Sequence, residues 1–533
     1  DRSEHMMAGG HACAQEFEGE AAVKNDGTVL GLRFNEYDDV GGSISTLTIH
    51  FTNKLNNLSN TYRTPAIHMI GNAVVTNKCP VIPNRGIGKP GMCYIWERMM
   101  DRVAQELNMS AIEVRRRNLI QPDEMPYRTI SGNVYDSGDY PGLLSTLLEK
   151  IDYDKLREEQ KKAREQGKFI GIGIVIGVEP GGRNAARDMA IFPEMKEPPG
   201  SGGVNGAKIK LEKNGTLTLH LGSPNCGQAH ETTTAQVAAE VLGSTPDKVS
   251  TSIPFDSDLS AWGVAAANSG NNFHLYDIGA IHGAATRLRE KILKLAAFNL
   301  KVEPSELTIE DSVVRVPGAA AKQITFAELG RIAYNNQHLI PDDMEAGLEA
   351  TFYYTFPHAK PNIVPGADRM VRAQFTFSAG AHAAIVEVDK ATGIVHVLRY
   401  LIVGDNGTVI NPDVVNGQVY GSAAHGIAVA LGEGFMYSAE GQPLTITYLD
   451  YGKCSTAETP RVEVIHRPSP SPYTSLGQKA AGEGAAIPSP AAIASAIEDA
   501  LTPFGVKVCD LPLTPEAVWR LANSNPESER RSY

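Results

Sequence analysis

The sequence has few cysteines, and none of them have the spacing that metal clusters need. Six cysteines are scattered over 533 residues, and no two form a CxxC motif. The chain is therefore not expected to hold an iron–sulfur cluster or a zinc ribbon by itself. We expect mostly buried thiols in a reducing compartment, which favours a cytoplasmic protein. The six residues are Cys13, Cys79, Cys93, Cys226, Cys454 and Cys509.

Long apolar runs and an excess of positive charge are missing as well. No stretch of about eighteen apolar residues is present, so no membrane span is predicted, and no signal peptide is expected at the start. The formal net charge of -12 argues against a nucleic-acid partner, because phosphate binding needs a clustered positive surface. The remaining composition, with 42% hydrophobic and 21% charged residues, is that of a globular protein.

The length of the chain predicts more than one domain. A highly charged segment, residues 149–168, is typical of a solvated helix that links two domains. We therefore expect one domain over residues 1–150 and a second over residues 151–533. Strands and helices do not alternate strictly along the sequence, which favours an α+β class over a doubly wound sheet.

Local patterns predict several hairpins and helices. Turn residues between alternating apolar segments predict hairpins around Asn25-Asp26-Gly27, over 204–221 and over 386–397. Apolar residues at helical spacing predict helices over 92–119, 232–242, 277–300 and 416–431.

Capping signals mark where two of the predicted helices begin. Ser110 with Glu113 forms a capping-box pattern that is expected to start a helix. Ser489 followed by Pro490 is expected to cap and open the last helix of the chain.

One segment that could take part in catalysis is Gly482-Glu483-Gly484, just before the helix expected at Ser489. Glycines on both sides let the backbone approach a bulky ligand, and a carboxylate there could act as a general base. Gly-Glu-Gly alone is also a common solvent-exposed loop, so this segment needs support from elsewhere.

A second segment, residues 222–233, is a strand end, a glycine-bearing turn and a helix start. Backbone N–H groups at such a turn bind anions or electron-rich heteroatoms, and Gln228 can both donate and accept hydrogen bonds. His230 has no second histidine at helical spacing, so a structural or capping role is favoured over metal binding.

Two further glycine-containing segments carry weaker signals. Residues 404–421 are typical of a turn followed by a helix whose small residues permit close packing. Residues 83–90 form a basic glycine loop before a helix, which could hold a phosphate group.

Taken together, and in their order along the chain, these segments resemble the molybdenum-binding subunit of the xanthine dehydrogenase, aldehyde oxidase and carbon monoxide dehydrogenase family. Each match is modest alone, but five in the same order from Asp1 to about Leu521 are highly specific. The matching stretches are Asp1–Met6, Asn84–Gly88, Gly227–Thr232, Thr408–Pro412 with Gly417-Gln418, and Gly482–Gly484.

The resemblance implies two mixed α+β domains with a molybdopterin cofactor between them, expected in its cytosine dinucleotide form. It implies an oxidoreductase that hydroxylates an N-heterocycle or an aldehyde with water as the oxygen source, with Glu483 as general base. The pterin's dithiolene holds the molybdenum, so no protein metal ligand is expected. The residues expected at the cofactor are Arg85, Gly86, Gly227, Gln228, Ala229, Ser269, Asn271, Gln418, Lys479 and Gly482.

The resemblance also implies partners besides a small-molecule substrate. The family's upstream region has no counterpart here, so another chain is expected to carry it unless the sequence is truncated. Because the chain lacks cluster cysteines, electrons are expected to leave through a separate iron–sulfur subunit and an FAD subunit.

Other functions remain open from the sequence. Gly86 stands where carbon monoxide dehydrogenases carry a cysteine, so carbon monoxide is not an expected substrate. The same cofactor could instead support reductive removal of a hydroxyl group from an aromatic thioester. A non-catalytic scaffold subunit is the alternative from a different class, and retention of Glu483 and Gln228 argues against it.

Overall fold

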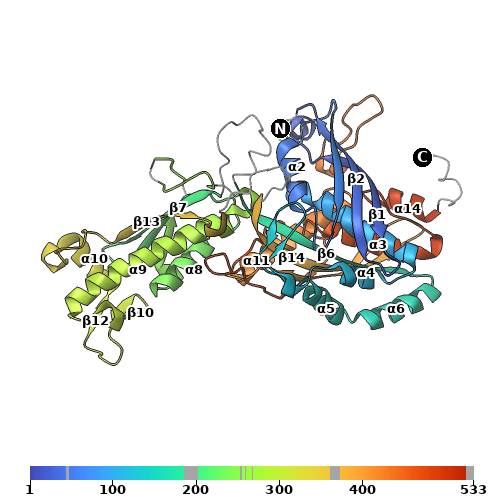
Figure 1. Cartoon of the computed structure of the whole chain (residues 1–533). Coiled ribbons are helices and arrows are strands. Elements are labelled where there is room, and N and C mark those ends of the chain that lie inside the picture. The colour runs from blue at the N-terminus through green and yellow to red at the C-terminus, as the bar shows by residue number, and fades with distance from the viewer. Residues whose placement is uncertain are drawn as a thin grey trace.

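The structure is a computed structural model that describes residues 1–43, 47–184, 202–252, 255–258, 260–266, 268–359 and 373–523. The described residues form two lobes (Figure 1). A larger lobe contains the N-terminal and C-terminal parts of the chain, and a narrower lobe built from residues 204–355 extends to one side. Sheets and helices form separate layers in both lobes, which confirms the predicted α+β class.

A four-stranded sheet with the order β16-β15-β14-β6 forms the centre of the larger lobe. Its strands come from both halves of the sequence and pair antiparallel, except for the parallel pair β15–β16. The predicted hairpin over 386–397 is part of this sheet and is confirmed. The strands are β6 (Phe169–Arg183), β14 (Gln374–Val388), β15 (Val395–Asp405) and β16 (Val462–His466).

Helices cover both faces of this central sheet. One face packs against α3 (Lys89–Leu107) and α5 (Tyr140–Lys150), and the other against α11 (Pro412–Leu431), α13 (Ser489–Ala500) and α14 (Pro515–Asn523). Alternate glycines in β6 make the second contact possible. A side chain at Gly171 would overlap the carbonyl of Ala496, and one at Gly173 would overlap that of Ala492, so α13 lies directly against the strand.

The first predicted hairpin belongs to a smaller sheet in the same lobe. Strands β1 (Ala14–Val23) and β2 (Val29–Gly41) pair antiparallel around the predicted turn. Strand β3 (Ile67–Val75) pairs parallel to β2 at the sheet edge. The remaining elements of this lobe are α1 (Arg2–Ala8), α2 (Leu47–Asn56), α4 (Ala111–Asn118), α6 (Tyr153–Glu165), α12 (Tyr448–Tyr451), β4 (Tyr127–Arg128) and β5 (Val134–Tyr135).

The narrower lobe is a sheet of order β13-β7-β8-β9 that packs against two helices. The hairpin predicted over 204–221 and both predicted helices are present. Its elements are β7 (Val204–Leu211), β8 (Leu217–Leu221), β9 (Val249–Ser252), β13 (Glu349–Thr355), α8 (His230–Leu242) and α9 (Ile278–Leu300), with β10 (Thr308–Glu310), β11 (Val313–Arg315), β12 (Gln323–Thr325) and α10 (Phe326–Asn335) at its tip.

The helix start predicted at Ser110 is confirmed, because Ser110 is the N-cap of α4, but other details of the capping predictions were wrong. Ser110 precedes α4 in an extended conformation, but its side chain makes no cap hydrogen bond. The cap of α13 is Pro488, so Ser489 is the first helical residue, and its Oγ donates to the carbonyl of Ala485 at 2.6 Å. α13 is not the last helix either, because α14 follows it.

The hydrophobic cores follow the lobes. One core joins side chains of residues 29–151 to strands β6, β14 and β15, and another combines the narrower lobe with Phe375 of β14. The domain boundary expected near residue 150 stays a prediction. Among the described residues, no helix is long and apolar enough to cross a membrane.

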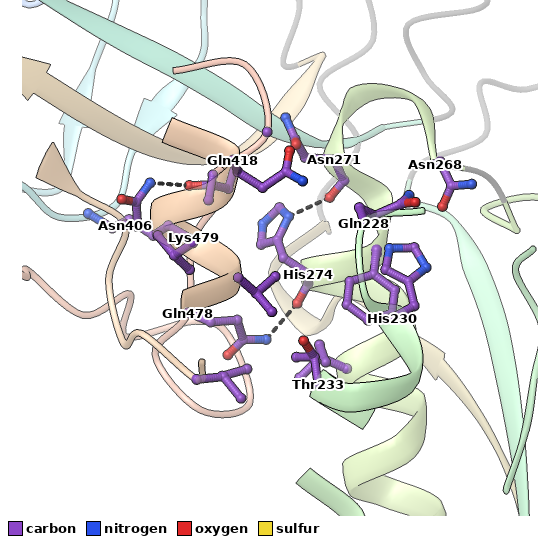
Figure 2. Close-up of a pocket in the computed structure, with 18 of the residues that line it drawn as sticks. Gln228, His230, Thr233, Asn268, Asn271, His274, Asn406, Gln418, Gln478 and Lys479 are labelled. Atoms are coloured by element: carbon purple, nitrogen blue, oxygen red, sulfur yellow. Dashed lines mark hydrogen bonds between the residues drawn. The ribbon is translucent and has the colours of Figure 1, made fainter. Parts of the chain in front are cut away.

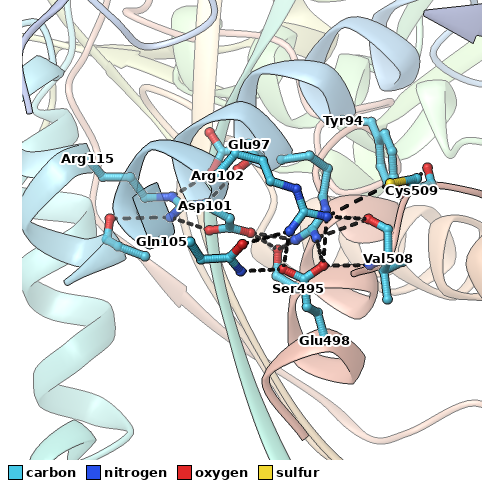
Figure 3. Close-up of polar contacts among 12 residues, drawn as sticks. Tyr94, Glu97, Asp101, Arg102, Gln105, Arg115, Ser495, Glu498, Val508 and Cys509 are labelled. Atoms are coloured by element: carbon cyan, nitrogen blue, oxygen red, sulfur yellow. Dashed lines mark hydrogen bonds and ion pairs between the residues drawn. The ribbon is translucent and has the colours of Figure 1, made fainter. Parts of the chain in front are cut away.

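A buried network of charges joins α3 to helix α13 (Figure 3). Arg98 donates to Asp101 Oδ2 at 2.6 Å and is also paired with Glu498. Arg115 donates from Nε to Glu97 Oε2 and from Nη1 to Asp101 Oδ1, both at 2.8 Å. Burial by itself would raise the pKa of Asp101, but the two guanidinium groups outweigh it and lower that pKa.

Arg115→Met should destabilise the protein strongly. The change leaves Glu97 and Asp101 buried without their main cation, and breaking such a pair typically costs roughly 3–5 kcal/mol. Urea denaturation measures the effect as a lower unfolding midpoint. Arg520→Met is the control, since Arg520 pairs with Glu516 on an exposed surface and its loss should leave the midpoint unchanged. Equal midpoints for both variants would contradict the role of this network.

Candidate cofactor-binding and active site

A cavity of about 460 Å³ lies between the two lobes. Its walls come from the start of α8, the turn before α9, the start of α11 and the loop before α13. Figure 2 shows amide side chains from both lobes around it. Predicted site residues that line the cavity are Arg85, Gly227, Gln228, Ser269, Asn271, Gln418, Lys479, Gly482 and Glu483.

The loop that carries Glu483 is tightly held by charged side chains. Arg85 donates from Nε to the carbonyl of Gly482 at 2.5 Å, and Glu179 Oε1 accepts the N–H of Glu483 at 2.5 Å. A side chain at Gly482 would overlap Asn271, and one at Gly484 would lie 2.7 Å from Glu179 Oε2. The flanking glycines are therefore required by close packing against protein side chains, while the close approach to a ligand that the sequence suggested stays a prediction.

The Glu483 side chain lines the cavity and is 17% exposed. Its Oε2 accepts a hydrogen bond from Lys89 Nζ at 2.5 Å. Lys89 belongs to the basic glycine loop for which the sequence suggested phosphate binding, and the structure instead pairs its ammonium group with Glu483. The carboxylate that the sequence singled out thus lies at the cavity wall next to a buried cation.

Arg85 connects the Glu483 loop to helix α11. Its Nη2 donates to Gln418 Oε1 at 2.8 Å and to the Gln418 carbonyl at 3.1 Å. Burial lowers the pKa of Arg85, and the carboxylates of Glu179 and Glu483 partly offset that effect. Two predicted site residues, Arg85 and Gln418, are therefore in direct contact although they are far apart in the sequence.

The turn before α8 presents Gln228 at the opposite wall. Gln228 Oε1 accepts the N–H of Cys226 at 2.8 Å, which leaves its amide NH2 group without a hydrogen bond within the described residues. Gly227 has a φ of +93°, and a Cβ added there would meet no described atom within 4 Å. The turn thus offers open space and hydrogen-bond donors on the cavity side.

His230 lies directly beneath this turn. Its ring stacks on Phe273 with 3.5 Å between centroids, and burial lowers the pKa of His230 to about 4. Its Nδ1 is buried and makes no hydrogen bond within the described residues. A neutral histidine with an unsatisfied ring nitrogen is suited to a polar ligand group rather than to pairing with the protein.

His274, which the sequence did not single out, also lines the cavity. Its Nε2 lies 2.7 Å from Thr376 Oγ1, its Nδ1 contacts the carbonyl of Asn271, and burial lowers its pKa to about 4. Gln478 donates to the carbonyl of His274 at 2.7 Å and so links the two lobes (Figure 2). No sequence motif marked this histidine, because Thr376 and Gln478 are distant from it in the sequence.

Three predicted cofactor residues either are paired within the protein or lie away from the cavity. Lys479 Nζ pairs with the buried carboxylate of Asp405 at 3.0 Å, so its charge is already matched by the protein. Gly86 and Ala229 do not line the cavity. Gly86 packs against Pro90, and Ala229 begins α8 with a φ of +56°. Cofactor contacts of all three stay predictions.

A group of potential metal ligands lies elsewhere, between the first sheet and helix α2. Cys13, Asp38 and His50 offer ligand atoms within 4.8 Å of one another. Lys54 occupies the same place, with Nζ at 2.6 Å and 2.8 Å from the two oxygens of Asp38. A buried ammonium group therefore already balances this carboxylate.

A buried carboxyl group, Asp277, holds the strand end that leads to the Gln228 turn. Its Oδ1 accepts from Asn205 Nδ2 and its Oδ2 from Ser223 Oγ, both at 3.0 Å. No cation faces it among its hydrogen-bond partners in the described chain, and burial raises the pKa of Asp277 to about 7. The group is therefore protonated in mildly acidic solution.

Models of the molybdopterin cofactor-binding domain match residues 1–119 and 146–460. The second match alone covers more than half of the chain. The chain belongs to the molybdenum hydroxylase large-subunit family.

Similar proteins agree with this family. The nicotine 6-hydroxylase large subunit of Paenarthrobacter nicotinovorans is 32% identical over 98% of this chain and 61% of its own length. The carbon monoxide dehydrogenase large chain of Hydrogenophaga pseudoflava is 32% identical, over 98% and 62%. Quinoline 2-oxidoreductase from Pseudomonas putida 86 has a TM-score of 0.86 at 30% identity, over 99% of this chain and 64% of that one. The chain thus spans about three fifths of the length of these relatives.

The residues around the cavity suit the cofactor that gives the domain family its name. Amide side chains of Gln228, Asn268 and Gln418 face the cavity and can match the donor and acceptor edges of a pterin. The open space at Gly227 and the unsatisfied Nδ1 of His230 add room and a polar contact. A molybdenum hydroxylase large subunit needs no protein ligand to the metal if the pterin supplies the sulfur donors.

Replacing Asp277 should change how stability depends on pH. The pKa of Asp277 is about 7 in the folded protein, against an ordinary value of 3.8. The folded state therefore binds this proton more tightly, and its contribution to stability is lost as the pH rises through about 7. Relative to Asp277→Asn, the free energy of unfolding of the wild type should fall by up to about 1.4 kcal/mol per pH unit between the ordinary pKa of 3.8 and the folded pKa of about 7.

Urea denaturation of both proteins at pH 5.5, 6.5 and 7.5 measures this difference. A difference that stays constant over the three pH values would contradict the protonated state of Asp277.

Proposed function

We propose that this chain is the cofactor-binding part of a molybdenum hydroxylase that oxidises an N-heterocycle or an aldehyde with water as the oxygen source. The observation that carries the proposal is the placement of Glu483, whose carboxylate lines the interlobe cavity opposite Gln228. When bound, the molybdenum cofactor supplies the two-electron redox chemistry and activates water.

The residues of this chain have three tasks in that reaction. Glu483 takes a proton from the attacking water, as a general base at the cavity wall. Gln228 and Gln418 orient the pterin through their amide groups, and Arg85 fixes both Gln418 and the Glu483 loop. Asn268 and Ser269, next to the same cavity, are proposed to contact the cytosine dinucleotide tail.

The substrate is proposed to be a small heteroaromatic compound or an aldehyde. Nicotine and quinoline, which are named in two of the relatives, both contain a nitrogen heterocycle. Carbon monoxide is not proposed, although two relatives are carbon monoxide dehydrogenases, because Gly86 lacks the thiol expected at that position.

Electrons are proposed to leave through separate iron–sulfur and FAD subunits. All six cysteines are unpaired, and the cysteines do not come together into a cluster site within the described residues. Free thiols also support a reducing compartment, and we propose the cytoplasm.

The region that longer relatives have beyond the matched part, whether on another chain or on more of this one, is proposed to pack against strand β3. None of the residues of β3 is buried. Ile70, Val74 and Val75 are 48%, 41% and 64% exposed. Parallel strands are normally covered on both faces, and an open edge pairs readily with another chain, so β3 is the proposed docking surface.

The native protein, purified with all its partner chains, should contain molybdenum. Elemental analysis of the sample together with identification of the co-purifying chains is the direct test. Iron should be present on partner chains and not on this one. A sample that holds every partner but no molybdenum would overturn the proposed function and favour a scaffold subunit.

Glu483→Gln should abolish turnover and leave the molybdenum content unchanged. Glutamine keeps the size of the side chain but cannot accept a proton at neutral pH, and general-base catalysis contributes about 10²–10⁴-fold in rate. The measurement is the turnover number per bound molybdenum, with Glu345→Gln on the exposed surface of the narrower lobe as control. Turnover near the wild-type value would remove Glu483 as the base.

A further inference from the structure

Glu483 lies in a loop, yet three charged side chains from other segments hold it in place. Arg85 from the loop before α3 binds the carbonyl that precedes it, Glu179 from β6 binds its N–H, and Lys89 from the start of α3 binds its carboxylate. All three distances are 2.5 Å. Two basic residues and one acidic residue therefore hold both the main chain and the side chain at Glu483.

Lys89 is buried, with 1% of its side chain exposed. Its Nζ donates to Glu483 Oε2 and, at 3.2 Å, to the carbonyl of Pro180. Burying an ammonium group is costly unless it is paired and hydrogen-bonded, so the contact with Lys89 holds the Glu483 side chain in one position.

Glu179 is also buried and accepts hydrogen bonds from three segments. Its Oε1 accepts the N–H of Glu483 and, at 2.9 Å, the amide of Asn271, while its Oε2 accepts from Ser378 Oγ at 3.2 Å. Burial, followed by the nearby charge of Glu483, raises the pKa of Glu179. Asn271 belongs to the narrower lobe and also lines the cavity. The Glu179 carboxyl group therefore fixes the Glu483 loop relative to both lobes.

We propose that Lys89 and Glu179 are positioning residues for the catalytic base. Lys89 fixes one carboxylate oxygen of Glu483, and the other oxygen, which makes no hydrogen bond within the described residues, is left free to take the proton. Glu179 fixes the backbone from which that side chain extends. The inference rests on the proposed function, in which Glu483 is the base. It gives Lys89 a role other than the phosphate binding that the sequence suggested, and it adds Glu179, which no sequence motif marked.

Substituting Lys89 in the native complex tests the positioning role. Lys89→Met keeps the length of the side chain and removes its charge, and we expect a loss in kcat of about 10–100-fold with KM changed less than about threefold. Lys89→Arg should retain most of the wild-type kcat, because it restores the cation. Lys294→Met, at an exposed pair with Asp343, is the control and should leave both constants unchanged.

A double-mutant cycle tests the ion pair without any turnover. Lys89→Met and Glu483→Gln should each lower the midpoint of urea unfolding, because each leaves one buried partner unpaired. The double variant should be less destabilised than the sum of the two single changes. Additive losses would overturn the pairing, whether or not the protein contains molybdenum.

The two experiments separate the possible failures. A sample without molybdenum defeats the proposed function, but the unfolding cycle still reports on the ion pair. A coupled cycle with wild-type kcat in Lys89→Met would make the pair purely structural and overturn the positioning role. The corresponding change Glu179→Gln keeps the size of that side chain and should lower kcat in the same way, with unchanged KM.

Discussion

Buried basic side chains on helix α3 require carboxylate partners, and these partners lie in the C-terminal segment of the chain. Lys89 pairs with Glu483, 394 residues away, and Arg98 pairs with Glu498, 400 residues away. An unpaired charge at either place would be strongly destabilising. The same helix therefore joins the beginning of the chain to its end and brings the proposed base to the cavity wall.

The central sheet makes this pairing possible. Glycines at 171 and 173 let α13 lie directly against β6, and β6 carries Glu179 at its far end, below the Glu483 loop. Strand β6 thus determines both the packing of α13 and the orientation of the Glu483 loop. Stability and chemistry depend on the same contacts, because the residues that close the core also fix the wall of the cavity.

The narrower lobe contributes the opposite wall, and its hydrophobic core also includes Phe375 from β14 of the larger lobe. Its turn at Gly227 and Gln228 is anchored from below by Asp277 and Ser223, while Gln478 from the larger lobe binds the carbonyl of His274. The cavity is therefore formed between two bodies that several hydrogen bonds link directly, including those of Asn271 with Glu179 and of Gln478 with His274. Such an interlobe position is usual for cofactor sites, because both bodies can supply polar groups.

The sequence alone determined the class of fold, the hairpins, most of the helices and the segments that line the cavity, since these follow from local periodicity and from motifs of neighbouring residues. It also pointed to Glu483, although only through the resemblance of five ordered segments, because Gly-Glu-Gly alone is a common loop sequence. Only the tertiary structure decided what surrounds that residue. Lys89 was interpreted as part of a phosphate-binding loop and Glu179 was not noticed, because each acts on Glu483 through contacts hundreds of residues apart. The partner of a buried charge depends on how distant segments pack, and no local pattern encodes it.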